Sequence, residues 1–195
     1  MAFAALYDAN VLIPHEIRDI LMISATTRQY AVFWSEDILA EWRKNHVGQT
    51  EDQWERIVGI MSELFPAACI ARSRYERIIQ SMTNHKGDRH VLAAAVVANA
   101  DVIVTSNVSH FKPAALELFN MEAQLPDVFV RTQAALNPLR FRQTFLRRAE
   151  ERNRISIRRG RGTLSPEDIA MYLRDGPSKM PETGQYLLEL LAQNN

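Results

Sequence analysis

The stretch Asp101-Val102-Ile103-Val104-Thr105 is the clearest strand in the chain, because it is short, continuous and rich in β-branched residues. A second run of this kind, Ala2 to Tyr7, opens the chain and stops at Asp8. A continuous apolar run, in contrast to an alternating one, predicts a strand buried on both faces, as in a parallel sheet. Stretches of helical periodicity between such strands favour an α/β fold.

The remaining elements are predicted from periodicity, caps and turn residues. We expect further strands at 30–34, 68–71 and 127–130, and helices at 11–23, 36–42, 51–65, 75–82, 88–99 and 113–119. The C-terminal third shows only helical patterns, at 137–153, 165–176 and 186–191. The sequence therefore predicts a central parallel sheet in an α/β domain at 1–130, followed by a helical extension at 131–195.

Composition excludes several classes of protein. Hydrophobic residues make up 47% and charged residues 24% of the 195 residues, which is ordinary for a globular protein. No apolar run reaches the ~18 residues of a membrane span, so we expect no membrane contact and a cytoplasmic location. A single cysteine, Cys69, excludes an internal disulfide framework. No glycine-rich dinucleotide or phosphate-binding loop is visible.

The net charge of zero hides a strong asymmetry along the chain. Residues 1–130 carry a net charge of −5, residues 131–163 carry +8 and residues 164–195 carry −3. The basic strip contains arginines that suit bidentate phosphate contacts, among them Arg140, Arg147, Arg148, Arg158, Arg159 and Arg161. Contact with RNA, docking of an acidic protein and plain surface solvation all remain open for this strip.

Polar side chains follow two of the predicted strands. Asp8 and Asn10 follow the first strand, and Thr105, Asn107 and His110 follow the other. Ligands of open parallel sheets bind beyond the carboxyl ends of the strands, so these residues are candidates for a site. Polar loops are common at strand ends, and this observation alone is weak.

Two further carboxylates lie on predicted helices. Glu41 is placed on or beside the inward stripe of its helix, although a half-exposed position at the edge of that stripe fits as well. Asp88 begins its helix, where it could point to the core side or act as a plain N-cap. Together with Asp8 they could line one acidic pocket, and repulsion between like charges would then call for Mg²⁺ or Mn²⁺.

Four short motifs carry a resemblance to PIN-domain ribonucleases. They are Leu6-Tyr7-Asp8-Ala9-Asn10-Val11-Leu12, Ser35-Glu36-Asp37-Ile38-Leu39-Ala40-Glu41, Gly87-Asp88-Arg89-His90-Val91-Leu92-Ala93-Ala94-Ala95 and Ala100-Asp101-Val102-Ile103-Val104-Thr105-Ser106-Asn107. The motifs stand in the order of the family and cover about residues 3–130. The chain most resembles bacterial toxins of the VapC type within this family, apart from its longer tail.

The resemblance implies a three-layer α/β/α fold and hydrolysis of RNA phosphodiesters with Mg²⁺ or Mn²⁺. Asp8, Glu41 and Asp88 would hold the metal, and Asn107 would complete the catalytic group. Asn10, Thr105 and His110 would orient water or substrate. Asn107 and His110 stand where the family often has aspartate, which affects the number of metals and the level of activity.

The resemblance also implies partners. A cognate antitoxin protein and a homodimer are expected on this basis, with RNA as substrate. Three alternatives remain: a PIN-like module that binds nucleic acid or protein through a weakened site, a phosphohydrolase acting on small phosphate esters, and an RNA-processing enzyme that is not a toxin.

Overall fold

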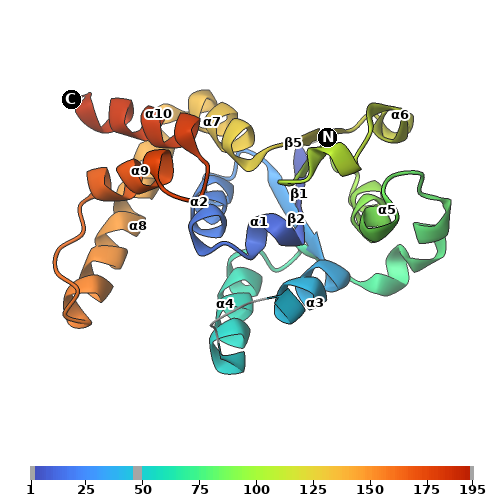
Figure 1. Cartoon of the computed structure of the whole chain (residues 1–195), viewed down its shortest axis with the longest axis horizontal. Helices are drawn as coiled ribbons and strands as arrows, with labels where there is room; N and C mark the ends of the chain where they lie inside the picture. Colours follow the sequence, from blue (N-terminus) through green and yellow to red (C-terminus); the bar gives the residue numbers. More distant parts are fainter. Residues whose placement is uncertain (1–2, 46–49, 194–195) are drawn as a thin grey trace. The chain divides into compact units, whose positions relative to one another are not determined.

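The computed structural model describes residues 3–45 and 50–193. Contacts within the chain define two compact units, one made of Met1–Ile13 and Gln29–Leu125 and the other of Pro14–Arg28 and Pro126–Asn195. The first unit contains the sheet, and the second unit is helical (Figure 1).

The sheet of the first unit has five strands in the order β3-β2-β1-β4-β5, and all neighbouring strands are parallel. The strands are β1 (Ala4–Tyr7), β2 (Ala31–Ser35), β3 (Cys69–Ile70), β4 (Val102–Val104) and β5 (Glu122–Gln124). β1 and β4 are buried along their whole length, as their continuous apolar runs predicted. The predicted α/β class with a central parallel sheet and a helical C-terminal part is confirmed. Ala2, predicted to open the first strand, lies outside the described residues.

The register of the two central strands places the candidate residues side by side. Tyr7 is opposite Val104, so Asp8 and Thr105 follow neighbouring strands at the same edge of the sheet. The backbone N–H of Asp8 donates to the carbonyl of Val104 at 3.1 Å, which extends the pairing to this edge.

Three longer helices belong to the first unit, and each has a local reason to begin or end where it does. α3 (Glu36–Asn45) begins after Ser35, whose Oγ caps the helix by accepting from the N–H of Ile38 at 3.3 Å. α4 (Glu51–Leu64) begins with a capping box between Thr50 and Gln53. α5 (Arg89–Ala98) ends at Asn99, which adopts the left-handed conformation with φ 50°.

Short helical segments connect these elements. They are α1 (Ala9–Leu12), α6 (Pro113–Leu116) and the 3-10 helices η1 (Arg72–Arg74), η2 (Glu76–Ser81), η3 (Lys86–Asp88), η4 (Val108–His110) and η5 (Glu117–Phe119). The segment predicted as a helix at 75–82 is therefore helical but of the tighter 3-10 type.

The second unit contains α2 (His15–Thr26), α7 (Pro126–Leu136), α8 (Pro138–Arg158), α9 (Pro166–Asp175) and α10 (Pro181–Ala192). Phe141 and Phe145 on α8 are buried, so these rings serve packing. α9 begins after Ser165, which forms a capping box with Asp168. None of the helices in the described ranges is long and apolar enough to cross a membrane.

The strand predicted at 127–130 is wrong, because these residues belong to α7. The short apolar run fits either state, and its buried residues Phe129, Val130, Gln133 and Ala134 follow helical spacing. The strand next to β4 is instead β5, whose residues are exposed or half-buried. Its backbone pairs with β4 although its side chains lack the apolar pattern of a buried strand.

Candidate active site

Asp8 is the centre of the candidate site. Its side chain is buried, and it caps α1 by accepting from the N–H of Ala9 at 2.7 Å. The other carboxylate oxygen, Oδ2, accepts from Asn10 Nδ2 at 2.6 Å and from Thr105 Oγ1 at 2.7 Å. Three donor atoms therefore fix one buried carboxylate at the carboxyl edge of the sheet.

The residues around Asp8 form a connected hydrogen-bond network. Asn10 Nδ2 also approaches Thr105 Oγ1 at 3.0 Å, and Asn10 Oδ1 accepts from the N–H of Ser106 at 2.8 Å. Thr105 Oγ1 accepts in turn from the N–H of Asn107 at 3.0 Å. Asn10 and Thr105 thus position Asp8, while the side chain of Asn107 is exposed next to them.

The electrostatics of Asp8 connect it to the other two predicted acids. Burial raises the pKa of Asp8 from 3.8 to about 6, and the carboxylates of Glu41 and Asp88 act in the same direction. Hydrogen bonds from Thr105 and Ala9 act in the opposite direction and favour the charged form. Glu41 and Asp88 are therefore close enough to Asp8 to disfavour its charge.

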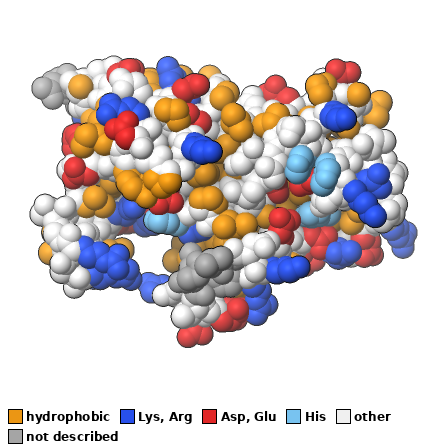
Figure 2. Space-filling model, viewed as in Figure 1, with side chains coloured by type: hydrophobic (Ala, Val, Ile, Leu, Met, Phe, Trp, Pro, Cys, Tyr) orange, Lys and Arg blue, Asp and Glu red, His pale blue; other side chains and the backbone are white. Residues whose placement is uncertain are grey.

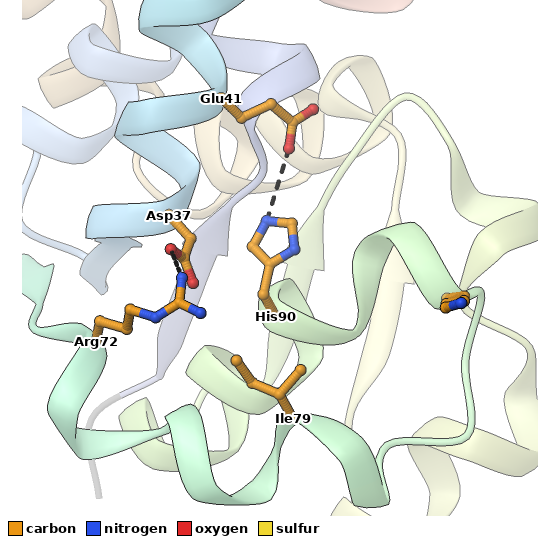
Figure 3. A pocket seen from close by; sticks show the side chains of 6 residues that line it. Asp37, Glu41, Arg72, Ile79 and His90 are labelled. Atoms are coloured by element: carbon orange, nitrogen blue, oxygen red, sulfur yellow. Dashed lines mark hydrogen bonds and ion pairs between the residues drawn. The ribbon is translucent and has the colours of Figure 1, made fainter.

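Glu41 is half-buried on α3. This agrees with the alternative prediction of a half-exposed position at the edge of the inward-facing stripe of its helix. Its Oε2 lies 3.6 Å from Nε2 of His90 on α5, which is an ion-pair distance beyond hydrogen-bond range (Figure 3). That Nε2 is buried and has no hydrogen-bond partner among the described residues. A polar atom of this kind is unusual in a folded protein and marks a place for a ligand or water.

Asp88 does not act as a plain N-cap, because its carboxylate makes no capping hydrogen bond to α5. Its Oδ2 instead meets two histidines, at 2.8 Å from His85 Nδ1 and 3.0 Å from His110 Nδ1. His110, predicted to orient substrate, thus contacts one of the predicted acids directly. His85 was missed at the level of sequence, and its spacing of three residues from Asp88 is the signal that could have found it.

The three predicted metal-binding residues, Asp8, Glu41 and Asp88, lie farther apart than a set of direct ligands to one ion. Among the described residues, the group whose ligand atoms all lie within 4.8 Å of one another is His85, Asp88 and His110, without Asp8 or Glu41. The oxygen donors Asp8, Glu41 and Asp88 still suit Mg²⁺, which keeps several of its own waters and binds few protein groups directly. A cation near them would also offset the repulsion from Glu41 and Asp88, which adds to the effect of burial on the pKa of Asp8.

An open pocket of about 320 Å³ lies beside Glu41 (Figure 3). It is lined by Asp37, Glu41, Arg72, Ile79, Lys86 and His90. The guanidinium of Arg72 forms an ion pair with Asp37, which fixes one cationic group at the wall of the pocket. The pocket therefore combines cationic groups, an apolar surface and the candidate carboxylate Glu41.

The predicted basic strip lies on α8 and just after it. Arg140, Arg147, Arg158, Arg159 and Arg161 are exposed, and Lys and Arg side chains gather where α8 ends (Figure 2). Arg148 differs, because it is half-buried and forms ion pairs with Asp19 at 3.3 Å and Glu151 at 3.1 Å. This arginine is therefore engaged within the second unit.

The comparisons with known proteins give one similarity over part of the chain. A segment of 62 residues is 48% identical to a protein named "Putative ribonuclease VapC50" from Mycobacterium tuberculosis (strain ATCC 25618 / H37Rv). The chain resembles a VapC ribonuclease there. The matched segment spans 32% of this chain and 37% of the length of that relative. No protein-family profile matches the chain, and no solved structure matches it.

Proposed function

We propose that the protein is an endoribonuclease that hydrolyses RNA phosphodiesters with Mg²⁺ or Mn²⁺. The observation that carries the proposal is the buried Asp8 carboxylate at the carboxyl edge of the sheet, whose pKa is raised by burial, Glu41 and Asp88. Keeping carboxylates together in this way costs stability, and binding of a hard cation would offset that cost. The similarity of 62 residues to a relative named as a ribonuclease supports the same chemistry.

Asp8, Glu41 and Asp88 are the residues proposed to hold the metal, directly or through water. A bound divalent cation would supply a water of lowered pKa and stabilise the charge that develops on the phosphodiester. Asn10 and Thr105 hold the Asp8 carboxylate in place through hydrogen bonds of 2.6 and 2.7 Å. The exposed amide of Asn107 is proposed to orient water or substrate beside them.

The pocket beside Glu41 is proposed to bind the RNA backbone. Lys86 offers positive charge to a phosphate at the wall of the pocket. Ile79 supplies an apolar surface against which a sugar or base could pack. These groups lie next to Glu41, so the bound strand would reach the proposed metal.

The biological setting is proposed from the VapC-like segment. The protein would be the toxin of a type II toxin–antitoxin pair, with a cognate antitoxin protein as partner and a homodimer as its assembly. Residues 1–130 would perform the cleavage. The arginine-rich extension at 131–195 would contact RNA or the antitoxin through its exposed arginines.

Incubation of the protein with RNA, with DNA of the same sequence and with a chromogenic phosphodiester tests the substrate class. We expect cleavage of RNA alone, with Mg²⁺ or Mn²⁺ present, and its loss in Glu41→Gln. Glu63→Gln is the matched control, because Glu63 is exposed on α4 and is not among the residues placed in the candidate site. Turnover of the small ester without RNA cleavage would point to a phosphohydrolase instead.

A binding module is the second candidate, and the histidine contacts of Asp88 are the observation that favours it. Both histidines meet the same oxygen, which reduces the capacity of Asp88 to bind a hard cation. This candidate predicts that RNA is bound but remains intact at every Mg²⁺ concentration. Metal-dependent cleavage that disappears in Glu41→Gln would reject it.

A further inference from the structure

We propose that His85, Asp88 and His110 form a binding site for a transition-metal dication of the Zn²⁺ class. The inference rests on this cluster alone and does not depend on the proposed nuclease function. One ring nitrogen from each histidine and one oxygen of Asp88 all lie within 4.8 Å of one another. Imidazole nitrogen and carboxylate oxygen are the mixed ligands that Zn²⁺ accepts and that Mg²⁺ does not prefer.

The backbone holds the two histidine-bearing segments together. The N–H of His85 donates to the carbonyl of His110 at 3.0 Å, although the two residues are far apart in the sequence. The N–H of Asp88 donates to the carbonyl of His85 at 2.9 Å, through the turn formed by η3. All three residues are thus fixed relative to one another by main-chain contacts, before any ion binds.

The side chains converge on one point. The His85 and His110 rings stack with centroids 4.3 Å apart and an interplanar angle of 25°, and both point Nδ1 at Asp88 Oδ2. Their distances of 2.8 and 3.0 Å to that oxygen need to open only to about 3.4 Å, the separation of two ligands in a tetrahedral site with bonds of about 2.1 Å. Small side-chain rotations therefore make room for an ion.

The site is accessible from solvent. The side chain of His85 is 57% exposed and that of His110 is 36% exposed, whereas Asp88 is mostly covered. Figure 2 shows histidine side chains beside acidic ones at the surface, on the side of the view where α5 and α6 lie. Three protein ligands with an open side leave a coordination position for water, as in zinc sites that are not purely structural.

Binding selects one tautomer of both rings. Each Nδ1 must offer its lone pair to the ion, so the neutral ring that binds carries its proton on Nε2. Asp88 contributes one oxygen as an anionic ligand.

Titration of the full chain with Zn²⁺, followed by calorimetry, tests the proposal. We expect one equivalent to bind, and Co²⁺ to give the visible absorption of an ion with nitrogen ligands at the same stoichiometry. His85→Gln and His110→Gln should each weaken Zn²⁺ binding by more than about tenfold. His15→Gln is the matched control, because the side chain of His15 is 60% exposed and lies 3.2 Å from Glu16, yet belongs to no such cluster among the described residues.

Thermal unfolding provides a second readout that needs no activity. Zn²⁺ should raise the melting temperature of the native protein and of His15→Gln, but not of His85→Gln or His110→Gln. Circular dichroism of the variants without metal checks that they fold. The proposal is overturned if native protein binds no stoichiometric Zn²⁺, or if both cluster variants bind it as tightly as His15→Gln. These Zn²⁺ titrations do not depend on RNA cleavage, so a protein without nuclease activity would still bind Zn²⁺ at this site.

Discussion

Thr105 donates a 2.7 Å hydrogen bond to the carboxylate of Asp8, and both side chains are buried at the ends of neighbouring parallel strands. The register of β1 and β4 produces this contact, because it places Tyr7 opposite Val104 and so brings the next residues together. A hydroxyl at this point compensates part of the cost of burying a charged carboxylate. Thr105 therefore acts as a positioning residue for Asp8.

Thr105→Val removes this donor while keeping the shape of the side chain. We expect the free energy of unfolding to fall by about 1–3 kcal/mol, because a buried carboxylate and the N–H of Asn107 both lose a partner. The pKa of Asp8 should rise further, since the hydrogen bond from Thr105 lowers it. Denaturant unfolding of the two proteins measures the first effect. Thr105→Ser restores the hydroxyl and should behave as native; equal losses in both variants would contradict this role.

Asp8→Asn should stabilise the metal-free protein at neutral pH. The pKa of Asp8 lies at 3.8 when exposed and at about 6 in the folded chain, so the folded state holds its proton more tightly. The protonated Asp8 side chain contributes to the free energy of unfolding, and this contribution is fully present below about pH 4. It is lost as the pH rises through 6, because the buried carboxyl then becomes charged. A rise of about 2 in pKa corresponds to about 3 kcal/mol, which is the upper limit of the gain in Asp8→Asn.

Unfolding in urea with a chelator, at pH 4.5 and at pH 8, measures this gain. The difference in the free energy of unfolding between Asp8→Asn and native protein should be larger at pH 8 than at pH 4.5. Addition of Mg²⁺ should then stabilise the native protein and leave Asp8→Asn unchanged. If this difference in the free energy of unfolding shrinks as the pH rises, burial of the Asp8 carboxylate is not what raises its pKa.

The sequence was sufficient to predict the parts of this site that depend on regular structure. Buried strands of parallel sheets are recognisable by continuous apolar runs, so the positions of Asp8 and Thr105 at one edge followed from β1 and β4. The helical pattern at 36–42 likewise predicted α3 and thereby the placement of Glu41. These features are encoded locally, within a few residues.

Contacts between loops were not predictable in the same way. The meeting of His85 with His110 depends on a hydrogen bond between distant segments, and neither residue belongs to a periodic pattern. β5 was missed because a strand at the edge of a sheet needs no apolar alternation. The run at 127–130 was assigned to a strand because β-branched and aromatic residues also fill the buried face of a helix.

Gly184→Ala should destabilise the second unit. A Cβ at this position would lie 2.4 Å from the backbone nitrogen of Arg174 and 2.7 Å from the carbonyl oxygen of Ala170, so α9 and α10 would have to separate. We expect a loss of about 1–3 kcal/mol in the free energy of unfolding.

Gly59→Ala is the matched control for this substitution. Gly59 lies inside α4, and a Cβ there would meet nothing within 4 Å. The alanine should therefore stabilise the protein by about 0.5–1 kcal/mol through helix propensity alone. Thermal melting of both variants compares them; a Gly184→Ala protein as stable as Gly59→Ala would contradict the close approach of the two helices.

The exposed arginines at the end of α8 should contribute to RNA affinity through phosphate contacts. Simultaneous replacement of Arg158, Arg159 and Arg161 by glutamine should weaken binding to single-stranded RNA. The slope of log affinity against log salt should fall by about 2, at about 0.7 for each lost contact. Filter binding at several salt concentrations gives both quantities.

Arg148→Gln is the comparison for the arginine variant. Arg148 is engaged with Asp19 and Glu151, so its replacement should leave the salt slope as it is and cost at most about 1 kcal/mol of stability. If the triple variant binds RNA as tightly as the native protein, these arginines do not contact RNA. Binding of an acidic protein then becomes the better explanation for the basic strip.

The central claim is that Asp8 and Asp88 support metal-dependent cleavage of RNA. Its most direct test is the rate of cleavage of a defined RNA over a range of Mg²⁺ concentrations, with native protein, Asp8→Asn and Asp88→Asn. We predict cleavage that requires Mg²⁺ and falls by more than about a hundredfold in both variants. Cleavage that proceeds equally well with a chelator, or that both variants retain, would contradict the claim.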